Sequence, residues 1–218
     1  YGVNGYGPSD LDWWEVNFIS EDRLERDVAR AHELADVVIV AMHWGTENFT
    51  GVDDYQAKYA QLLADLNVDL VLGSHPHVIG PVEWLAGTDG HQTLMAYSLG
   101  NFLFENDTTT HQPADFYEKY HMSNTSMVGE GMDNRSKNGT IGLGVNPDVW
   151  RSVIAQWDVE GGQATALRLY PIHLGMELPR YRRGLPAFAE DDALLAHLAE
   201  LSAPFGTRID IVDHVGIV

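Results

Sequence analysis

Two consecutive units, each an amphipathic helix followed by a short apolar segment, constrain the fold of this chain most strongly. Residues 20–34 have apolar side chains at helical spacing and are followed by the apolar segment 35–42. Residues 55–67 and 68–73 repeat this order. Short apolar segments rich in β-branched residues are typical of strands that are buried on both faces. The repeated order therefore predicts parallel strands covered by helices, which is an α/β fold.

Further strands are expected downstream of these units. Two β-hairpins, each with glycine in its turn, are predicted for 78–85 with 92–99 and for 151–159 with 163–174. A helix is expected over 191–201 and a short strand over 208–212. Residues 105–149 are rich in Asn, Asp, Gly, Ser and Thr and lack a sustained period, so we expect mostly loop, an insertion or a flap there. Since the pattern contains no clear linker, we expect one domain over residues 1–218.

The charge of the chain narrows the classes of partner. It has 13 basic and 32 acidic residues, a formal net charge of −19. Such a field repels nucleic acid and anionic membranes, so we expect no nucleic-acid partner. A phosphate substrate would need a metal ion or local arginines to reverse the sign of the field. The chain contains no cysteine, so any metal must be bound through nitrogen and oxygen ligands.

Histidines follow both predicted parallel strands. His43 comes after the first, and His75 and His77 flank Pro76 after the second. Because the carboxyl ends of parallel strands share one edge, these rings should lie near each other. Neutral imidazole suits Zn, Mn or Fe, and side-chain alternation in an extended His-Pro-His would place both rings on one side. The alternatives are a structural His43 and a proline turn with exposed histidines.

Two further segments offer polar groups near this edge. Ser98, Gly100 and Asn101 lie at the end of a predicted strand. They could supply hydrogen bonds to an oxyanion, could orient a metal-bound histidine, or could simply form a capped turn. Glu47 could act as an acid or base, could orient a histidine, or could be a solvated loop charge. We take Glu47 and Asn101 as candidate catalytic residues and Ser98 and Gly100 as candidate substrate-binding residues.

One compact basic cluster stands out in this acidic chain. Arg180, Arg182 and Arg183 lie within four positions. They could contact an anionic ligand or belong to a solvated loop. We take Arg182 as a candidate substrate-binding residue.

Three motifs occur in an order that resembles a known family. They are His-Trp-Gly-Thr-Glu at 43–47, Gly-Ser-His-Pro-His-Val at 73–78 and Tyr-Ser-Leu-Gly-Asn-Phe at 97–102. Together they resemble the CapA-type poly-γ-glutamate capsule synthesis proteins, a branch of the calcineurin-like metallophosphoesterases. The resemblance implies a four-layer α/β/β/α sandwich, of which this chain is the C-terminal part. It also implies two divalent metal ions (Mn, Fe or Zn), with His43 and His75 on one ion and His77 on the other.

The family's N-terminal motifs, a Gly-Asp strand end and an Asn-His pair, have no counterpart in this chain. The resemblance therefore implies that an upstream segment of the same protein completes the metal site and anchors the protein to the membrane. The expected function is a metal-dependent phosphoesterase-like enzyme that synthesises or attaches capsule polymer at the bacterial cell surface. Its partners would be an anionic polymer or phosphate-containing substrate and other capsule synthesis proteins. The alternatives are a non-catalytic binding or scaffolding protein for an anionic polymer, and a metallophosphatase with another substrate.

Overall fold

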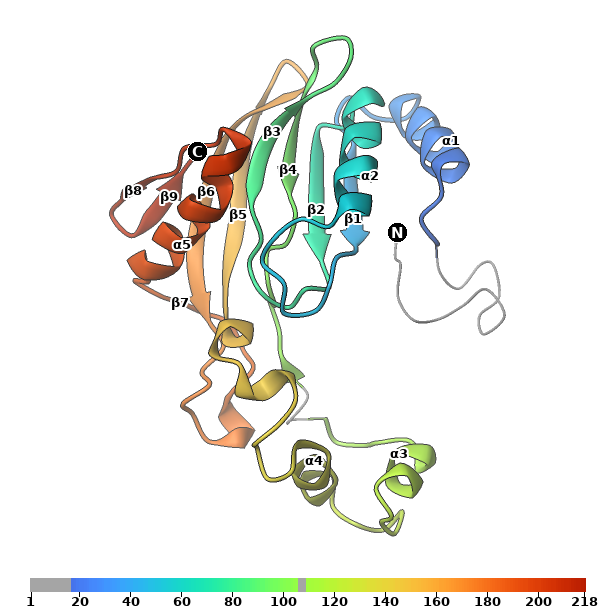
Figure 1. Cartoon of the computed structure of the whole chain (residues 1–218), viewed down its shortest axis with the longest axis vertical. Helices are drawn as coiled ribbons and strands as arrows, with labels where there is room; N and C mark the ends of the chain where they lie inside the picture. Colours follow the sequence, from blue (N-terminus) through green and yellow to red (C-terminus); the bar gives the residue numbers. More distant parts are fainter. Residues whose placement is uncertain (1–16, 106–108) are drawn as a thin grey trace.

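The computed structural model describes residues 17–105 and 109–218, which form two β-sheets with helices packed against them (Figure 1). The longer elements of the first part are α1 (Glu21–His32), β1 (Ile39–His43), α2 (Asp54–Asp65), β2 (Leu70–Ser74), β3 (Val82–Ala86) and β4 (Gln92–Ala96). They are followed by α3 (Ala114–Lys119), α4 (Val128–Ser136), η2 (Leu143–Val145) and η3 (Pro147–Trp150). The last part contains β5 (Arg151–Glu160), β6 (Gln163–His173), η4 (Arg180–Arg182), β7 (Ala187–Phe188), α5 (Asp192–Ser202), η5 (Ala203–Phe205), β8 (Asp210–Val212) and β9 (Val215–Ile217). No helix within these described ranges is both long enough and apolar enough to cross a bilayer.

The first sheet confirms the parallel strands that the helix-strand units predict. Its order is β1-β2-β4-β3, with β1 and β4 parallel to β2 and β3 antiparallel to β4. The register pairs His43 with Ser74, so β1 and β2 end at the same level. Side chains that follow these two strands therefore emerge at one edge of the sheet.

The two faces of the first sheet are covered differently. Helices α1 and α2 cover one face with a buried cluster that includes Leu24, Leu63, Val40, Val71 and Met95. The opposite face packs against the second sheet and α5 through the buried residues Leu70, Leu94, Leu167, Leu169 and Leu195. Two of the buried clusters thus hold the first sheet in place, one on each face.

The second sheet has the order β5-β6-β9-β8, and β7 also pairs with β6. Its long antiparallel hairpin turns at Gly161 and Gly162, both with positive φ, as the sequence predicts. Helix α5 contacts both β3 and β9, so it packs on the side of the second sheet that faces the first. The α/β class with two sheets is confirmed. Among the described residues, no helix covers the far face of the second sheet, where Tyr170 and Gln156 form a hydrogen bond.

The segment expected to be mostly loop contains short helices. Helices α3 and α4 lie away from both sheets, beyond the end where β1 and β2 finish (Figure 1). They have six and nine residues, and their buried residues are Tyr117 in α3 and Gly131 and Met132 in α4. Because so few side chains are buried, the sequence shows no helical period here.

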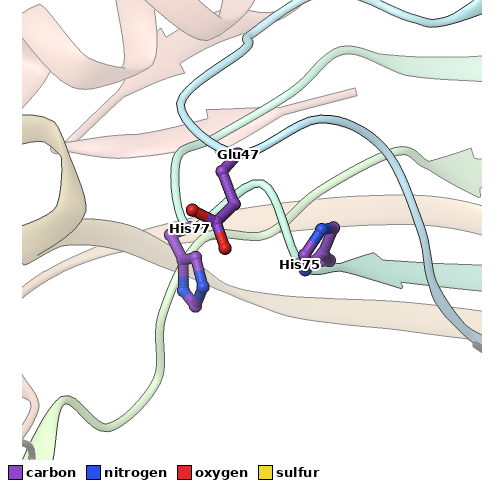
Figure 2. A group of neighbouring side chains, drawn as sticks. All are labelled: Glu47, His75 and His77. Atoms are coloured by element: carbon purple, nitrogen blue, oxygen red, sulfur yellow. The ribbon is translucent and has the colours of Figure 1, made fainter. Parts of the chain in front are cut away.

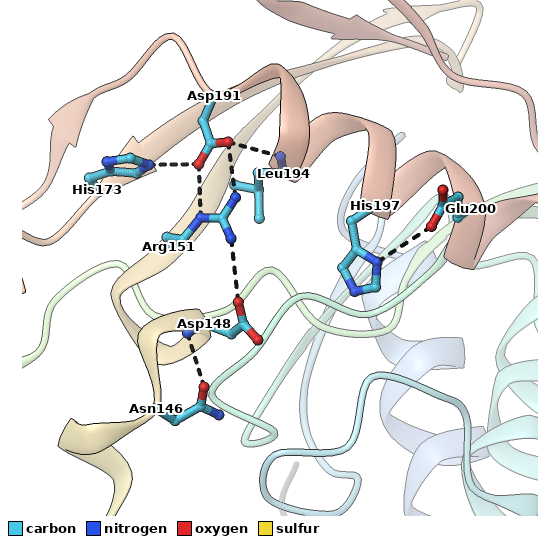
Figure 3. A network of polar contacts seen from close by, with 8 residues as sticks. All are labelled: Asn146, Asp148, Arg151, His173, Asp191, Leu194, His197 and Glu200. Carbon is cyan, nitrogen blue, oxygen red and sulfur yellow. Dashed lines mark hydrogen bonds and ion pairs between the residues drawn. The ribbon is translucent and has the colours of Figure 1, made fainter.

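A partly buried polar network joins the second sheet to α5 (Figure 3). Asp191 caps α5 by accepting from the Leu194 backbone N–H, and its two carboxylate oxygens accept from Arg151 at 2.8 and 2.9 Å. His173 Nε2 lies 2.7 Å from the same carboxylate. Burial alone would raise the pKa of Asp191, but the hydrogen bonds from Arg151, His173 and Leu194 outweigh it and hold this pKa well below its usual range.

We expect Asp191→Asn to lower the free energy of unfolding by about 2 kcal/mol at pH 7, because hydrogen bonds between Arg151 and a full carboxylate are lost. Since the folded-state pKa is depressed, this contribution is present above the unfolded pKa of about 4 and is lost as the pH falls below it. Urea unfolding at pH 7 and at pH 3 measures the difference. Asp210→Asn, in the exposed pair with Arg208, is the control and should change stability by less than about 0.5 kcal/mol. An equal loss in both variants would contradict the assignment.

Candidate metal centre

Three loops meet at the carboxyl edge of the first sheet. The Trp44 backbone N–H donates to the Ser74 carbonyl at 2.9 Å, and the Asn48 N–H donates to the Pro76 carbonyl at 2.8 Å. Gly45 has φ 93°, and a Cβ atom there would lie 2.9 Å from the Pro76 ring. The loop after β1 is therefore fixed directly against the loop after β2.

Glu47, His75 and His77 converge in these loops (Figure 2). One ligand atom from each of the three lies within 4.8 Å of the others. The carboxylate is exposed and both imidazoles are half-buried, so the cluster opens to solvent on the side of Glu47. Two nitrogen ligands and one oxygen ligand at this spacing suit a divalent transition metal.

His43 lies beside this cluster as the last residue of β1. Its ring centroid is 4.7 Å from that of His75, and its Nδ1 atom is 3.3 Å from the Ser74 hydroxyl oxygen. Burial, followed by the nearby charges of His75 and His77, lowers the pKa of His43. A lowered pKa favours the neutral imidazole, which is the form that binds metal.

The backbone between His75 and His77 is turned. His75 has φ 99° and His77 has φ 63°, so both occupy the left-handed region that non-glycine residues rarely adopt. The prediction of an extended His-Pro-His segment is therefore wrong. The two rings are nevertheless near each other, with their centroids 6.1 Å apart. Such conformations cost about 1–3 kcal/mol each and cluster at functional sites.

Asn101 determines which nitrogen of His77 faces the cluster. Its amide Nδ2 donates to the carbonyls of His77 and Val149, at 3.4 and 3.0 Å. Its Oδ1 is therefore the acceptor for His77 Nδ1, 2.8 Å away. This contact assigns the proton to Nδ1 and leaves Nε2 with a lone pair, an arrangement typical of metal-binding histidines and their supporting residues.

The candidate substrate-binding residues of the same loop have structural contacts. Ser98 is buried, and its hydroxyl donates to the Val78 carbonyl at 2.7 Å and accepts from the Gly100 N–H at 3.3 Å. Gly100 has φ 78°, and a Cβ atom there would approach Ser152 to 2.7 Å. These contacts shape the loop that holds Asn101, and a role of Ser98 and Gly100 in substrate binding stays a prediction.

Arg182 lies outside this convergence. It is exposed at the end of η4, while its neighbours Arg180 and Arg183 line a cavity beside α4. Its role in substrate binding stays a prediction. The structure groups Glu47 with His75 and His77 as a candidate metal ligand. The sequence does not indicate this role, because the path of the loop after β1 decides where the Glu47 side chain lies.

The donor set fits one divalent ion better than two. Glu47, His75 and His77 supply one atom each, and His43 adds a fourth nearby imidazole. A two-metal site needs more ligands than these four residues supply, including oxygen ligands that bridge the two ions. Further donors would have to come from outside the described residues.

The segment that contains the three motifs matches a known protein family. Residues 5–106 match the family described as bacterial capsule synthesis protein PGA_cap. The three motifs lie within this matched segment, so their resemblance to the CapA-type capsule synthesis proteins is confirmed.

Individual relatives cover the chain to different extents. An uncharacterised protein of Sinorhizobium fredii, y4sH, is 32% identical over 209 residues, which is 88% of this chain and 43% of that protein. The PGA biosynthesis protein CapA of Bacillus subtilis is 38% identical over 82 residues, 38% of this chain and 20% of that protein. The capsule biosynthesis protein CapA of Bacillus anthracis is 35% identical over 75 residues, 34% of this chain and 17% of that protein. The chain thus spans less than half the length of these curated relatives.

Proposed function

We propose that this chain forms part of a metal-dependent, phosphoesterase-like enzyme that acts in the synthesis or attachment of an anionic capsule polymer at the bacterial cell surface. The observation that supports it most is the convergence of Glu47, His75 and His77 at the carboxyl edge of a parallel sheet, with His77 oriented by Asn101. The relatives named for capsule and PGA biosynthesis support the polymer and the cell-surface association.

In this proposal the ligands are His43, His75, His77 and Glu47. A bound divalent ion (Mn, Fe or Zn) would polarise an oxyanion and activate water. Asn101 would hold His77 in the tautomer that binds metal, and the left-handed turn at 75–77 would keep both rings in place. Glu47 is the carboxylate of the cluster, and as an exposed group it could also accept a proton from water.

A second ion would require donors from a further part of the same polypeptide. Among the described strands, β1 lies at the edge of its sheet, and its side chains Ile39 and Ala41 are exposed on the face opposite to the one that α1 and α2 cover. Ile39 is 46% exposed, which is unusual for isoleucine in a strand. A strand paired with the edge of β1 would bring its own end next to His43, and neighbouring residues of the same segment would cover Ile39 and Ala41. We propose that an upstream segment supplies this strand, the remaining ligands and the membrane anchor.

The second candidate is a non-catalytic protein that binds or scaffolds an anionic polymer. The small donor set of the described residues favours it, because few ligands would hold metal weakly. Such a protein would have the same fold and bind the same polymer as the proposed enzyme, but it would not catalyse a reaction.

The deciding experiment uses the intact protein with its upstream residues. We expect Mn²⁺-dependent cleavage of bis(p-nitrophenyl) phosphate, abolished by EDTA and reduced at least about 100-fold in Glu47→Gln. The matched control is Glu200→Gln, an exposed glutamate at the C-terminal end of α5. Binding of γ-linked polyglutamate without any turnover would support the scaffold. Turnover of phosphoesters without polymer binding would favour a metallophosphatase with another substrate.

A further inference from the structure

A cavity of about 430 Å³ lies between α4, the loop 139–145 and η4. Its size is within the range of small-molecule sites. Three of the 13 basic residues in the chain line it, namely Arg135, Arg180 and Arg183. No carboxylate of the described residues is among its lining residues. In a chain of net charge −19, this is a local reversal of sign.

Two of the three arginines contact other side chains of the protein. Arg180 forms an ion pair with Asp133 at 2.6 Å, and the Arg183 guanidinium lies 5.0 Å from the centre of the Trp150 ring. Arg135 is exposed on α4. The residues that line the cavity thus include three positively charged side chains and no negatively charged one, and Asp133 lies beside Arg180. Guanidinium groups fixed in this way bind carboxylates through paired hydrogen bonds.

Apolar side chains form another part of the wall. Phe104, Met132 and Met176 line the cavity together with the arginines. An inorganic anion would gain nothing from these side chains. A ligand that combines carboxylates with methylene groups would contact both kinds of surface.

Two chain segments connect this cavity to the candidate metal centre. Phe104 is three residues after Asn101, so their Cα atoms are at most about 11 Å apart. Val145 lines the cavity, and the next residue, Asn146, donates from its side chain to Asn48 at 2.9 Å, next to Glu47. One extended ligand could therefore contact both places.

We propose that this cavity is a subsite for the carboxylate groups of an acidic chain whose reacting group lies at Glu47, His75 and His77. The proposal rests on the proposed function, and it specifies how the polymer is recognised. The arginines bind the carboxylates, and the apolar wall receives the methylene groups between them.

The test is the affinity of the intact protein for γ-linked glutamate oligomers, measured by titration calorimetry. We expect Arg135→Gln to weaken binding about 10-fold and the double variant with Arg183→Gln to weaken it about 100-fold, because each removes charge-assisted hydrogen bonds. Glutamine is also a good helix former, so α4 should stay folded in the single variant. The control Arg208→Gln, an exposed arginine in the last part of the chain, makes the same change in net charge and should alter affinity less than about 2-fold.

Three further arms separate the outcomes. The Mn²⁺ affinity of Arg135→Gln should equal that of the unchanged protein. Free phosphate and γ-linked oligoglutamine should bind weakly and without dependence on Arg135. Equal oligomer affinity in Arg135→Gln, the double variant and Arg208→Gln would overturn the subsite, whatever the metal centre does. Arginine-dependent oligomer binding in a protein without turnover would retain the subsite and reject the enzyme.

Discussion

Replacing His75 and His77 together with alanine is expected to weaken Mn²⁺ binding by the intact protein at least about 100-fold. Both imidazoles belong to the cluster whose ligand atoms lie within 4.8 Å, and their removal leaves only Glu47 and the flanking His43. Loss of a supporting residue alone typically costs 10–100-fold in metal affinity, so loss of two ligands should cost at least the upper value. Titration of Mn²⁺ followed by electron paramagnetic resonance of the free ion measures the change.

Two further variants test whether the effect on Mn²⁺ binding is specific to this cluster. Asn101→Ala removes the acceptor for His77 Nδ1 and should weaken Mn²⁺ binding by about 10–100-fold. His197→Ala, a half-exposed histidine on α5 whose partner is Glu200, should leave metal affinity unchanged. Undiminished Mn²⁺ binding in the double variant would show that these histidines are not ligands.

A glycine version of the same change separates metal binding from folding. His75 and His77 have φ 99° and 63°, a conformation in which glycine is relaxed and histidine is strained. His75→Gly with His77→Gly should therefore lose Mn²⁺ while it keeps or raises the midpoint of urea unfolding. A fall in both quantities would mean that the histidines serve packing instead of a functional centre.

The sequence predicts those parts of the fold that have a strong local pattern. The helices and strands up to β4 repeat an apolar period over long segments, and α2 spans 54–65 where 55–67 was predicted. The long hairpin is specified by its paired glycines at 161 and 162. Short elements give no such pattern. β9 has three residues, and α3 buries Tyr117 alone, so tertiary contacts determine both.

The sequence likewise predicts some features of the candidate site and not others. The positions of His43, His75 and His77 follow from the ends of parallel strands, which the sequence shows. The left-handed turn at 75–77 does not, because local preference disfavours it for histidine and the neighbouring loops impose it. The position of Glu47 likewise depends on the contact of Asn48 with Pro76 across two loops.

Gly73→Ala is expected to lower the free energy of unfolding by about 3–5 kcal/mol. A Cβ atom at Gly73 would lie 1.9 Å from the Tyr97 carbonyl oxygen and 2.7 Å from Trp44 Nε1. It would clash with both the donor and the acceptor of the buried hydrogen bond from Trp44 to Tyr97, which is 3.0 Å long. Overpacking against backbone and loss of a buried hydrogen bond each cost about 1–3 kcal/mol, and Gly73 is held on both sides by neighbouring strands. Urea unfolding followed by tryptophan fluorescence measures the loss.

The matched control is Gly144→Ala, where a Cβ atom would make ordinary contacts of 3.7 and 3.8 Å with Phe104 and Trp150. It should leave stability unchanged or raise it by about 0.5 kcal/mol, since alanine restricts the unfolded chain. If the Gly73→Ala variant were as stable as the Gly144→Ala variant, the end of β2 would not approach Tyr97 this closely. A selective loss in Gly73→Ala would explain why glycine precedes the Ser-His-Pro-His turn. Only a residue without a side chain lets Trp44 and Tyr97 approach each other over the strand from which the loop with His75 and His77 starts.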